Sequence, residues 1–312
     1  MHCDQTSTSG CYREYQKRMN IVLDYIDSHY HEKLTVEDLA GVAHFSAYHF
    51  HRIFHSIVGE TVSVYVRNLR LSKSAHKLLY CNQLPVVDIA LMCGFASQSD
   101  FSRSFKAFYG ISPTQYRRTR ERRAVSLRDS ASGAAQKTGH VRTDPVMELK
   151  STIRIDSLPD LNVAYIRCTG LSKELKSSRI ENAFSTLFRW GAPRGYVGSQ
   201  TSILGVILDS PEIVPMEQCR YDVCMTVQQG VGPEGEIGVK RILTKGKYVV
   251  FTFLRSRPDA DNVFFTAADF IYGCWMPDNG YLPDDKPFLE FFRQDAGTQG
   301  IWTDFYIPIK PF

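Results

Sequence analysis

Two short stretches of the sequence place hydrogen-bonding side chains on one side of an expected helix and aromatic side chains on the other. In GFASQSDFSRSF, at 94–105, the polar side holds Gln98, Ser99, Ser102 and Arg103. In HFSAYHFHRIF, at 44–54, the polar side holds Tyr48, His51 and Arg52. Amide and guanidinium groups are planar and form paired hydrogen bonds, so these residue types suit the recognition of a polar partner.

The two stretches belong to an internal repeat. At an offset of 50, similar residues recur as the pairs Leu34/Leu84, Val36/Val86, Asp38/Asp88, Leu39/Ile89 and Ala40/Ala90. After one inserted residue, an offset of 51 relates the pairs Phe50/Phe101, Arg52/Arg103, Phe54/Phe105, Gly59/Gly110, Tyr65/Tyr116 and Arg67/Arg118. Chance does not keep so many similarities in step, so the period indicates a structural unit that occurs twice.

Local rules predict a short helix, a tight turn and a longer helix in each copy. In the first copy, Thr35 with Asp38 resembles a capping box, and Ser46 caps the longer helix. In the second copy, Gly94 suits the turn and Ser97 caps the longer helix. With the aromatic residues facing inward, the sequence predicts two helix-turn-helix units.

Composition divides the chain into two domains. We expect a flexible tail at 1–14, a helical domain at 15–123, a flexible linker at 124–147 and an α+β domain at 148–312. The linker is rich in Ser, Ala, Gly and Thr and lacks apolar periodicity, which is typical of a flexible connection.

The charge differs between the two domains. Residues 1–123 hold 16 Lys and Arg against 11 Asp and Glu, whereas residues 148–312 hold 18 against 20. A basic domain suits a polyanionic partner, although a merely basic surface explains the charge alone equally well. No apolar run approaches the roughly 20 residues of a membrane helix. The eight cysteines form no C-x-x-C pair, so we expect a cytoplasmic protein without a metal or other cofactor.

Residues 15–120 resemble the DNA-binding domain of the AraC/XylS family of bacterial transcription regulators. The segment DIALMCGFASQSDFSRSFKAFYGISPTQYRR, at 88–118, carries that family's signature. The resemblance implies seven helices, with two helix-turn-helix units joined by a long helix at 62–79. It also implies a transcription regulator that has RNA polymerase as a partner and is not an enzyme.

The resemblance assigns the polar side of each longer helix to the major groove of double-stranded DNA, where side chains meet base edges. The implied DNA contacts are Thr35, Tyr48, His51, Arg52, Gln98, Ser99, Ser102 and Arg103. Arg pairs with guanine and Gln with adenine, each good pair giving roughly 1–3 kcal/mol of discrimination, whereas Ser and Thr more often contact phosphate. Two reading helices on one chain imply that a monomer binds two adjacent major grooves.

Three groups of residues keep a second interpretation. Arg52 and Arg103 are ordinary surface charges if the motif does not apply. His51 and His55 have the i, i+4 spacing of metal ligands, but no third ligand is evident. The cluster at 117–123 suits phosphate contacts and a solvated helix end equally well.

Strand-like runs dominate the second domain and alternate with two helical stretches. The runs are LPDLNVAYIRCTG (158–170), SILGVILDSP (202–211), CRYDVCMTV (219–227), LTKGKYVVFTFL (243–254), PFLEFF (287–292) and DFYIPIK (304–310). They resemble the GyrI-like effector-binding domain, in the arrangement of Rob-type AraC regulators. The resemblance implies duplicated strand–helix–strand–strand units in a curved antiparallel sheet, with helices on one face and a ligand groove on the other.

Strand alternation sorts the residues of this sheet between its two faces. In PFLEFF, Leu289 and Phe291 are expected to face the helices, which leaves Glu290 in the groove, where Tyr306 joins it. By resemblance, a carboxylate among aromatic rings binds a bulky apolar cation through charge and cation–π attraction. The candidate ligand residues are therefore Glu290, Tyr306 and Trp275. The alternatives are a surface salt bridge for Glu290 and ordinary core for Trp275.

The sequence also allows two other functions for the second domain, and it contains one motif that resembles a nucleotide-binding site. Some GyrI-like proteins hydrolyse small electrophiles with a Glu and a Tyr, which would make Glu290 a base and Tyr306 its partner. Alternatively, the acidic domain inhibits or contacts another protein. The formal G-x-G-x-x-G at 230–235 contains Pro233 and is followed by a strand pattern, so it predicts a hairpin loop rather than a nucleotide site.

Overall fold

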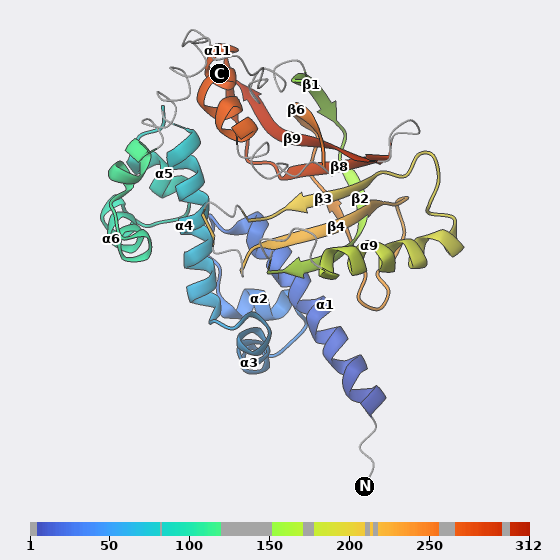
Figure 1. Cartoon of the computed structure of the whole chain (residues 1–312). Helices are drawn as coiled ribbons and strands as arrows, with labels where there is room; N and C mark the ends of the chain where they lie inside the picture. The colour runs from blue at the N-terminus through green and yellow to red at the C-terminus, as the bar shows by residue number, and fades with distance from the viewer. Residues whose placement is uncertain are drawn as a thin grey trace. The chain divides into compact units, whose positions relative to one another are not determined.

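The computed structural model describes residues 5–81, 83–119, 152–170, 178–209, 213–214, 218–255, 266–294 and 300–312. These residues form two units, one built mainly from residues up to Arg118 and the other mainly from later residues (Figure 1). The predicted linker at 124–147 lies outside the described residues. No helix in the described ranges is long and apolar enough to cross a membrane.

The first unit contains two helix-turn-helix pairs and a long helix between them, so its predicted fold class is confirmed. The helices are α1 (Gln5–His29), α2 (Val36–Val42), α3 (Ala47–Val58), α4 (Val62–Tyr80), α5 (Val86–Met92) and α6 (Gln98–Tyr109). Figure 1 shows α4 running between the pair α2–α3 and the pair α5–α6. Another helix begins at Pro113 and is described as far as residue 119, giving the expected seven in this range.

Helix α1 occupies most of the segment for which the sequence predicts a flexible tail. It begins at Gln5, whereas the tail is expected to extend to residue 14. Residues 5–14 contain no proline, so every residue there can donate a helical backbone hydrogen bond. They also lack apolar periodicity, which is why the pattern by itself does not predict a helix there.

The predicted capping residues begin the helices. Thr35 Oγ1 accepts the Asp38 N–H at 3.1 Å, and Asp38 Oδ2 accepts the Thr35 N–H at 3.3 Å, which completes the capping box. Ser46 accepts the backbone N–H of His49 at 3.4 Å in α3, and Ser97 accepts that of residue 100 at 3.1 Å in α6. Each such cap contributes about 1 kcal/mol to stability.

Buried aromatic rings fix the inner side of each longer helix. Phe50 and Phe54 of α3 are fully buried, as are Phe101 and Phe105 of α6. The ring centroids are 5.7 Å apart in the first pair and 5.4 Å apart in the second. Because burial of each ring stabilises the fold by roughly 1.5–3 kcal/mol, it determines which side of the helix stays at the surface.

The second unit is a nine-stranded sheet in which the described pairings are antiparallel. The strands are β1 (Arg154–Leu158), β2 (Leu161–Thr169), β3 (Ile203–Ile207), β4 (Arg220–Thr226), β5 (Gly238–Ile242), β6 (Gly246–Leu254), β7 (Tyr281–Pro283), β8 (Phe288–Gln294) and β9 (Ile301–Pro311). Helix α9 (Ser178–Gly191) packs on β2 and β4, and a helical segment at 266–278 ends in α11 (Met276–Asp278).

Two halves of this unit repeat the same order of elements, as the sequence predicts. The first half runs β2, α9, β3, β4, and the second runs β6, the 266–278 helical segment, β8, β9. The order in the sheet is β1-β6-β9-β8-β3-β4-β2-β5, so β8 and β3 pair at the middle. Gly205 of β3 lies directly opposite Glu290 of β8 in that pairing.

The two faces of the sheet differ in what covers them, and the predicted orientation of β8 is wrong. Leu289 and Phe291 pack in a buried cluster that contains no residue of α9. Phe292 points to the other face, where its ring centroid lies 5.3 Å from that of Phe184 of α9. Glu290 shares this helix-covered face by alternation. The sequence FLEFF is apolar on both faces, so alternation cannot determine which face meets the helix.

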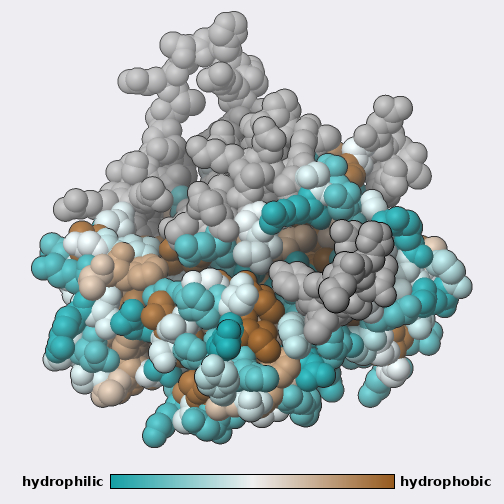
Figure 2. Space-filling view, turned by 90° about the horizontal axis from the view of Figure 1, so that it is seen from below, coloured by the Kyte–Doolittle hydropathy of each residue, from teal (hydrophilic) through white to brown (hydrophobic). Residues whose placement is uncertain are grey.

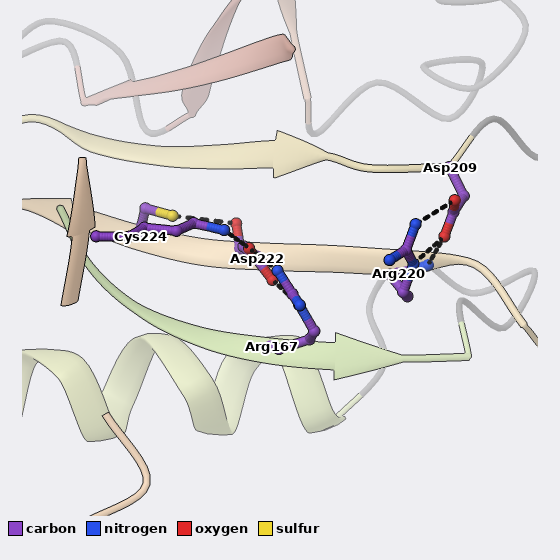
Figure 3. A network of polar contacts seen from close by, with 6 residues as sticks. Arg167, Asp209, Arg220, Asp222 and Cys224 are labelled. Atoms are coloured by element: carbon purple, nitrogen blue, oxygen red, sulfur yellow. Dashed lines mark hydrogen bonds and ion pairs between the residues drawn. The ribbon is translucent and has the colours of Figure 1, made fainter. Parts of the chain in front are cut away.

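Two buried aspartates, Asp222 and Asp209, form ion pairs at strand β4 (Figure 3). Asp222 is fully buried and accepts two hydrogen bonds of 2.8 Å from Arg167, while Lys240 Nζ donates a third at 2.6 Å. Arg220 Nε lies 2.7 Å from Asp209 Oδ2 in the second pair. Burial by itself raises the pKa of Asp222, but the two cations outweigh burial and hold the pKa below its ordinary value.

The tempting glycine motif forms a turn. Glu234 and Ile237 exchange two backbone hydrogen bonds of 3.0 and 2.9 Å, and strand β5 follows directly. Residues 230–235 therefore form a loop without the following helix that a dinucleotide site needs, as predicted. The loop is not a hairpin between β4 and β5, because β2 lies between these two strands in the sheet.

Some large apolar side chains of the described residues are exposed at the surface. Figure 2 shows hydrophobic residues in small patches among hydrophilic ones on the face that it presents. In the helical unit the exposed apolar side chains include Tyr48, Val87, Leu91, Met92 and Phe108. Tyr48 is the most exposed of them, at 68%. Single exposed apolar residues are normal at protein surfaces, so position decides which of them matters.

Replacing Asp222 with Asn leaves Arg167 and Lys240 facing a neutral amide in the interior. We expect the free energy of unfolding at pH 7 to fall by about 3–5 kcal/mol, measured by urea unfolding of the full chain. Asp160→Asn is the control, since its partner Arg241 is exposed, and it should change the stability much less.

The same variant has a signature in its pH dependence. The pKa of Asp222 is lower in the folded chain than in the unfolded chain, so its stabilisation is present above a pH of about 4 and is lost as the pH falls further. Asp222→Asn should lack this part of the acid loss. An unchanged stability curve would show that the ion pairs do not stabilise the sheet.

Candidate functional site

The polar side of α3 is exposed, and its arginine lies against its tyrosine. Tyr48, His51 and Arg52 all reach the surface. Arg52 Nη1 donates to Tyr48 Oη at 3.4 Å, and Arg52 Cζ lies 5.8 Å from the ring centroid. The i, i+4 spacing places the two side chains one above the other. A side chain that is already ordered loses less entropy when it contacts a partner.

The polar side of α6 has the matching residues. Gln98, Ser99 and Arg103 are exposed, and Ser102 is half-buried. Gln98 and Ser99 lie in the first turn of the helix, where the helix dipole favours an anionic partner. The polar residues predicted on α3 and α6 are thus exposed, except the half-buried Ser102, while the paired phenylalanines of both helices are buried. Their contacts with DNA stay a prediction.

Thr35 has a structural role in addition to any contact with DNA. Its hydroxyl donates to Asp38 Oδ2 at 2.6 Å while accepting the Asp38 N–H. The hydroxyl proton is therefore used inside the cap of α2. A phosphate contact from Thr35 stays a prediction that this geometry does not favour.

The arginine cluster after Pro113 divides into a structural residue and residues outside the described ranges. Arg117 Nη2 donates to the Leu84 carbonyl oxygen at 2.7 Å, which ties its helix to the segment before α5. Residues 120–123 lie outside the described part. Within the described part, no group of three His, Cys, Asp or Glu could hold a metal ion, so His51 and His55 gain no third ligand there.

Glu290 lies near the middle of the sheet in the second unit and has two polar partners. It is 5% exposed, and its Oε2 accepts a hydrogen bond from Tyr221 Oη at 2.8 Å. Its Oε1 forms an ion pair with Arg255 Nη1. The alternative of a surface salt bridge for Glu290 is therefore wrong, because the carboxylate is buried.

Arg255 joins the carboxylate to the aromatic residues of the same face. Its guanidinium carbon lies 5.4 Å from the centroid of the Phe292 ring, and Phe292 meets Phe184 edge to face. A delocalised cation is thus held by a carboxylate on one side and an aromatic ring on the other. This is the chemistry that the sequence predicts for a ligand at Glu290, supplied here by a side chain of the same protein.

Tyr221 donates a hydrogen bond to Glu290, and its hydroxyl stays protonated over the ordinary pH range. Burial raises the pKa of Tyr221 well above its ordinary value, and the charge of Glu290 raises it further. Gly205 leaves the space that this ring needs, because a Cβ at Gly205 would lie 1.7 Å from Tyr221 Oη.

The predicted pairing of Tyr306 with Glu290 is wrong. In the β8–β9 pairing, Glu290 lies opposite Phe305, whereas Tyr306 lies opposite Leu289 on the other face. Tyr306 Oη donates to Asp156 there at 3.0 Å. Burial and this hydrogen bond raise the pKa of Tyr306 to about 12. A hydrolytic pair of Glu290 and Tyr306 is therefore excluded by geometry.

Trp275 has an aromatic partner of its own in the second unit. Its ring stacks on Tyr281 with centroids 5.8 Å apart and planes 8° apart. Tyr281 pairs with Pro311 at the end of β9, six residues along that strand from Phe305, the partner of Glu290. A ligand contact from Trp275 stays a prediction that these contacts do not support.

Sequence reasoning missed two residues of this site, Tyr221 and Arg255. Tyr221 lies in the strand-like run RYDVCMT, so its phase relative to Glu290 follows once the pairing of β3 with β4 and β8 is known. Arg255 directly follows β6 and carries no sequence pattern that distinguishes it from other surface arginines. Tertiary pairing is the only signal for both.

Comparison with known proteins matches both units to families. The model of a helix-turn-helix domain matches residues 39–119, and that of the GyrI-like small molecule binding domain matches residues 151–310.

The curated relatives match over about a third of this chain. The HTH-type transcriptional regulator YbfP of Bacillus subtilis is 43% identical over 103 residues, which are 33% of this chain and 35% of that protein. The transcriptional regulator Rob of Salmonella typhimurium is 36% identical over 107 residues, 34% of this chain and 37% of that protein. The HTH-type transcriptional activator AarP of Providencia stuartii is 38% identical over 96 residues, 31% of this chain and 70% of that protein. The chain thus spans well under half the length of the first two.

Replacing Gly205 with Ala should destabilise the second unit. The added methyl group would collide with Tyr221 Oη, and relieving the collision moves the buried ring away from Glu290. We expect a loss of about 1–3 kcal/mol, measured by urea unfolding.

Gly198→Ala is the matched control, because nothing lies within 4 Å of a Cβ at Gly198. If the two variants unfold at the same urea concentration, Tyr221 does not occupy the space beside Gly205.

Proposed function

The chain belongs to the family of the GyrI-like small molecule binding domain and carries an AraC-type helix-turn-helix domain before it, and on that premise we propose that it is a DNA-binding transcription regulator controlled by a small molecule. One observation carries the DNA-binding part most directly. Two helices of the same unit bury paired phenylalanines and expose polar residues in matching positions. Neither polar face is needed for the core, so both are available to a partner.

The polar faces suit two successive major grooves of duplex DNA. Arg52 and Arg103, related by the repeat, would read guanine, and Gln98 would read adenine. Successive major grooves on one side of the duplex are roughly 34 Å apart. Because both reading helices belong to one chain, one monomer would bind an asymmetric site without a second copy.

The ligand would bind at Glu290 on the helix-covered face of the sheet. The contacts that support this are the buried carboxylate, the aromatic ring of Phe292 and the guanidinium of Arg255 between them. A planar or bulky apolar cation has the same charge and the same affinity for an aromatic face as Arg255. We propose that such a cation competes with Arg255 for Glu290.

The remaining partners follow from the proposed function. A regulator of transcription acts where DNA and RNA polymerase meet, so we place the protein in the cytoplasm with the polymerase as a partner. We propose no enzymatic activity, because a sensor needs to retain its ligand.

Replacing Arg52 or Arg103 with Ala should reduce discrimination between bases more than overall affinity. Each variant should lose roughly 1–3 kcal/mol of preference at one position of its half-site. The measurement is competition binding with a duplex selected from a random library by the wild-type protein, against single-base variants of that duplex.

Arg67→Ala is the matched control, since it removes the same charge from an exposed position of α4. It should weaken binding to all sequences alike. Base preference that is unchanged in both Arg52→Ala and Arg103→Ala would show that these faces do not read DNA.

Replacing Arg255 with Ala should strengthen the binding of an organic cation, and replacing Glu290 with Gln should weaken it. Removal of Arg255 leaves the Glu290 carboxylate without its ion-pair partner, so we expect about tenfold tighter binding, and about tenfold weaker binding for the amide. Ethidium, a planar fluorescent cation, is the probe, titrated into the full chain without DNA.

Arg293→Ala serves as the control for lost charge, because Arg293 pairs with Asp304 rather than with Glu290. Its affinity for ethidium should match the wild type. Equal affinities in all of these proteins would place the ligand elsewhere.

A further inference from the structure

One arginine of the connecting helix α4 donates hydrogen bonds to three backbone carbonyl groups, which belong to two separate parts of the helical unit. Arg70 of α4 donates from Nε to the Tyr30 carbonyl oxygen at 2.7 Å and from Nη2 to that of Glu32 at 2.6 Å. Its Nη1 donates to the Gly94 carbonyl oxygen at 2.8 Å. Tyr30 and Glu32 lie between α1 and α2, whereas Gly94 lies between α5 and α6. A single planar group therefore joins the two helix-turn-helix units.

The two backbone segments also meet directly at Gly94. Its φ is +79°, a conformation that residues with a side chain rarely adopt. A Cβ at Gly94 would lie 2.7 Å from the His31 carbonyl oxygen and 3.0 Å from Arg70 Cζ. The turn between α5 and α6 thus packs against the segment between α1 and α2, at a point where no side chain fits.

The helix before the first helix-turn-helix pair carries a comparable arginine, which contacts that pair. Arg18 of α1 donates to the Ala43 and His44 carbonyl oxygens at 3.5 and 3.4 Å, and its guanidinium lies 5.1 Å from the Phe45 ring centroid. Each arginine therefore binds the turn of the helix-turn-helix pair that follows its own helix: Arg18 binds the turn between α2 and α3, and Arg70 binds the turn between α5 and α6. Arg70 makes shorter hydrogen bonds, and it additionally binds the segment that precedes the first helix-turn-helix pair.

The surroundings of α4 explain why this link matters. Val66 and Leu69 of α4 belong to the core of the first unit, and α4 also contacts α5 and α6. The shared helix α4 sets the separation of the two helix-turn-helix pairs, but it contacts each pair on one side only. Arg70 adds three hydrogen bonds that connect the segments preceding and within these pairs beside α4. Hydrogen bonds from a charged donor are stronger than those from a neutral donor. The planar guanidinium also loses little freedom when it binds several acceptors.

We propose that Arg70 is a positioning residue that fixes the relation between the two recognition helices, so that the protein reads two half-sites at one separation only. This inference depends on the proposed DNA-binding function. Arg70 touches neither polar face, so its effect would be transmitted through the backbone at Gly94 and at 30–32. Rigid linkage makes binding of the second half-site effectively intramolecular, and a loose linkage reduces that advantage.

The test compares the spacing of half-sites rather than affinity alone. The wild-type full chain first selects a duplex from a random library, and binding is then measured to that duplex, to one with a base pair inserted between the half-sites, and to duplexes with one half-site scrambled. The insertion rotates one half-site relative to the other by about 34°. The wild type should lose more than about tenfold in affinity on insertion.

Arg70→Ala should bind the selected duplex about tenfold more weakly and lose less than about threefold on insertion. Its affinity for the duplexes with one intact half-site should stay within about twofold of the wild type. Arg70→Lys, which cannot reach all three acceptors, should be intermediate. Arg18→Ala should weaken the contribution of the first half-site and keep the full penalty for insertion.

A pair of glycine variants separates the contact from backbone strain. Gly94→Ala and Gly110→Ala introduce a side chain at nearly the same φ, +79° and +78°. Nothing lies within 4 Å of a Cβ at Gly110, whereas one at Gly94 meets His31 and Arg70. Only Gly94→Ala should reproduce the relaxed spacing of Arg70→Ala, and thermal unfolding of every variant confirms that it is folded.

Three outcomes overturn the inference. The first is an insertion penalty in folded Arg70→Ala, Arg70→Lys and Gly94→Ala equal to that of the wild type. The second is an equal loss by Arg70→Ala on intact and scrambled duplexes, which would make Arg70 merely structural. The third is a library selection that returns no preferred sequence, and this outcome alone also refutes the proposed function.

Discussion

Burial of paired phenylalanines is the interaction on which the helical unit depends. Phe50 and Phe54, and likewise Phe101 and Phe105, are fully buried on one side of their helices. A helix that buries one side must expose the other, so the polar residues reach the surface without contributing to the core. The same physical cause operating twice explains why the sequence repeats. The aromatic positions are alike in the two copies of the repeat, whereas the polar positions differ except at Arg52 and Arg103.

The second unit differs from the helical unit because several of its charged residues, such as Glu290 and Asp222, are buried. The duplicated halves meet where β3 pairs with β8, and Glu290 lies on that seam opposite Gly205. A buried carboxylate is costly unless it is paired, and Tyr221 and Arg255 provide that pairing. Strand β4 carries Asp222, which is paired with Arg167 and Lys240 in the same way on the other face.

In both units a glycine lies beside the contacts on which our proposals depend. Gly205 leaves room for the ring of Tyr221, and Gly94 lets a turn approach the segment at 30–32. In each place an arginine completes the contact, Arg255 on a carboxylate and Arg70 on three carbonyl groups. The two arginines differ in what they bind: Arg255 pairs with a charged carboxylate, for which we propose that a cation competes, whereas Arg70 binds neutral backbone carbonyl groups.

The sequence by itself determined the helix-turn-helix units, their caps at Thr35, Ser46 and Ser97, and the strand content of the second domain. These features depend on contacts within a few residues, or on a repeat that is visible in the chain. The beginning of α1 at Gln5 escaped prediction because residues 5–14 lack an apolar stripe. Only the tertiary structure decided the faces of β8, because Leu289 and Phe292 are equally apolar and alternation fixes a period but no phase. The same holds for the partners of Glu290 and for Arg70, since a hydrogen bond between residues far apart in the chain leaves no trace in local spacing.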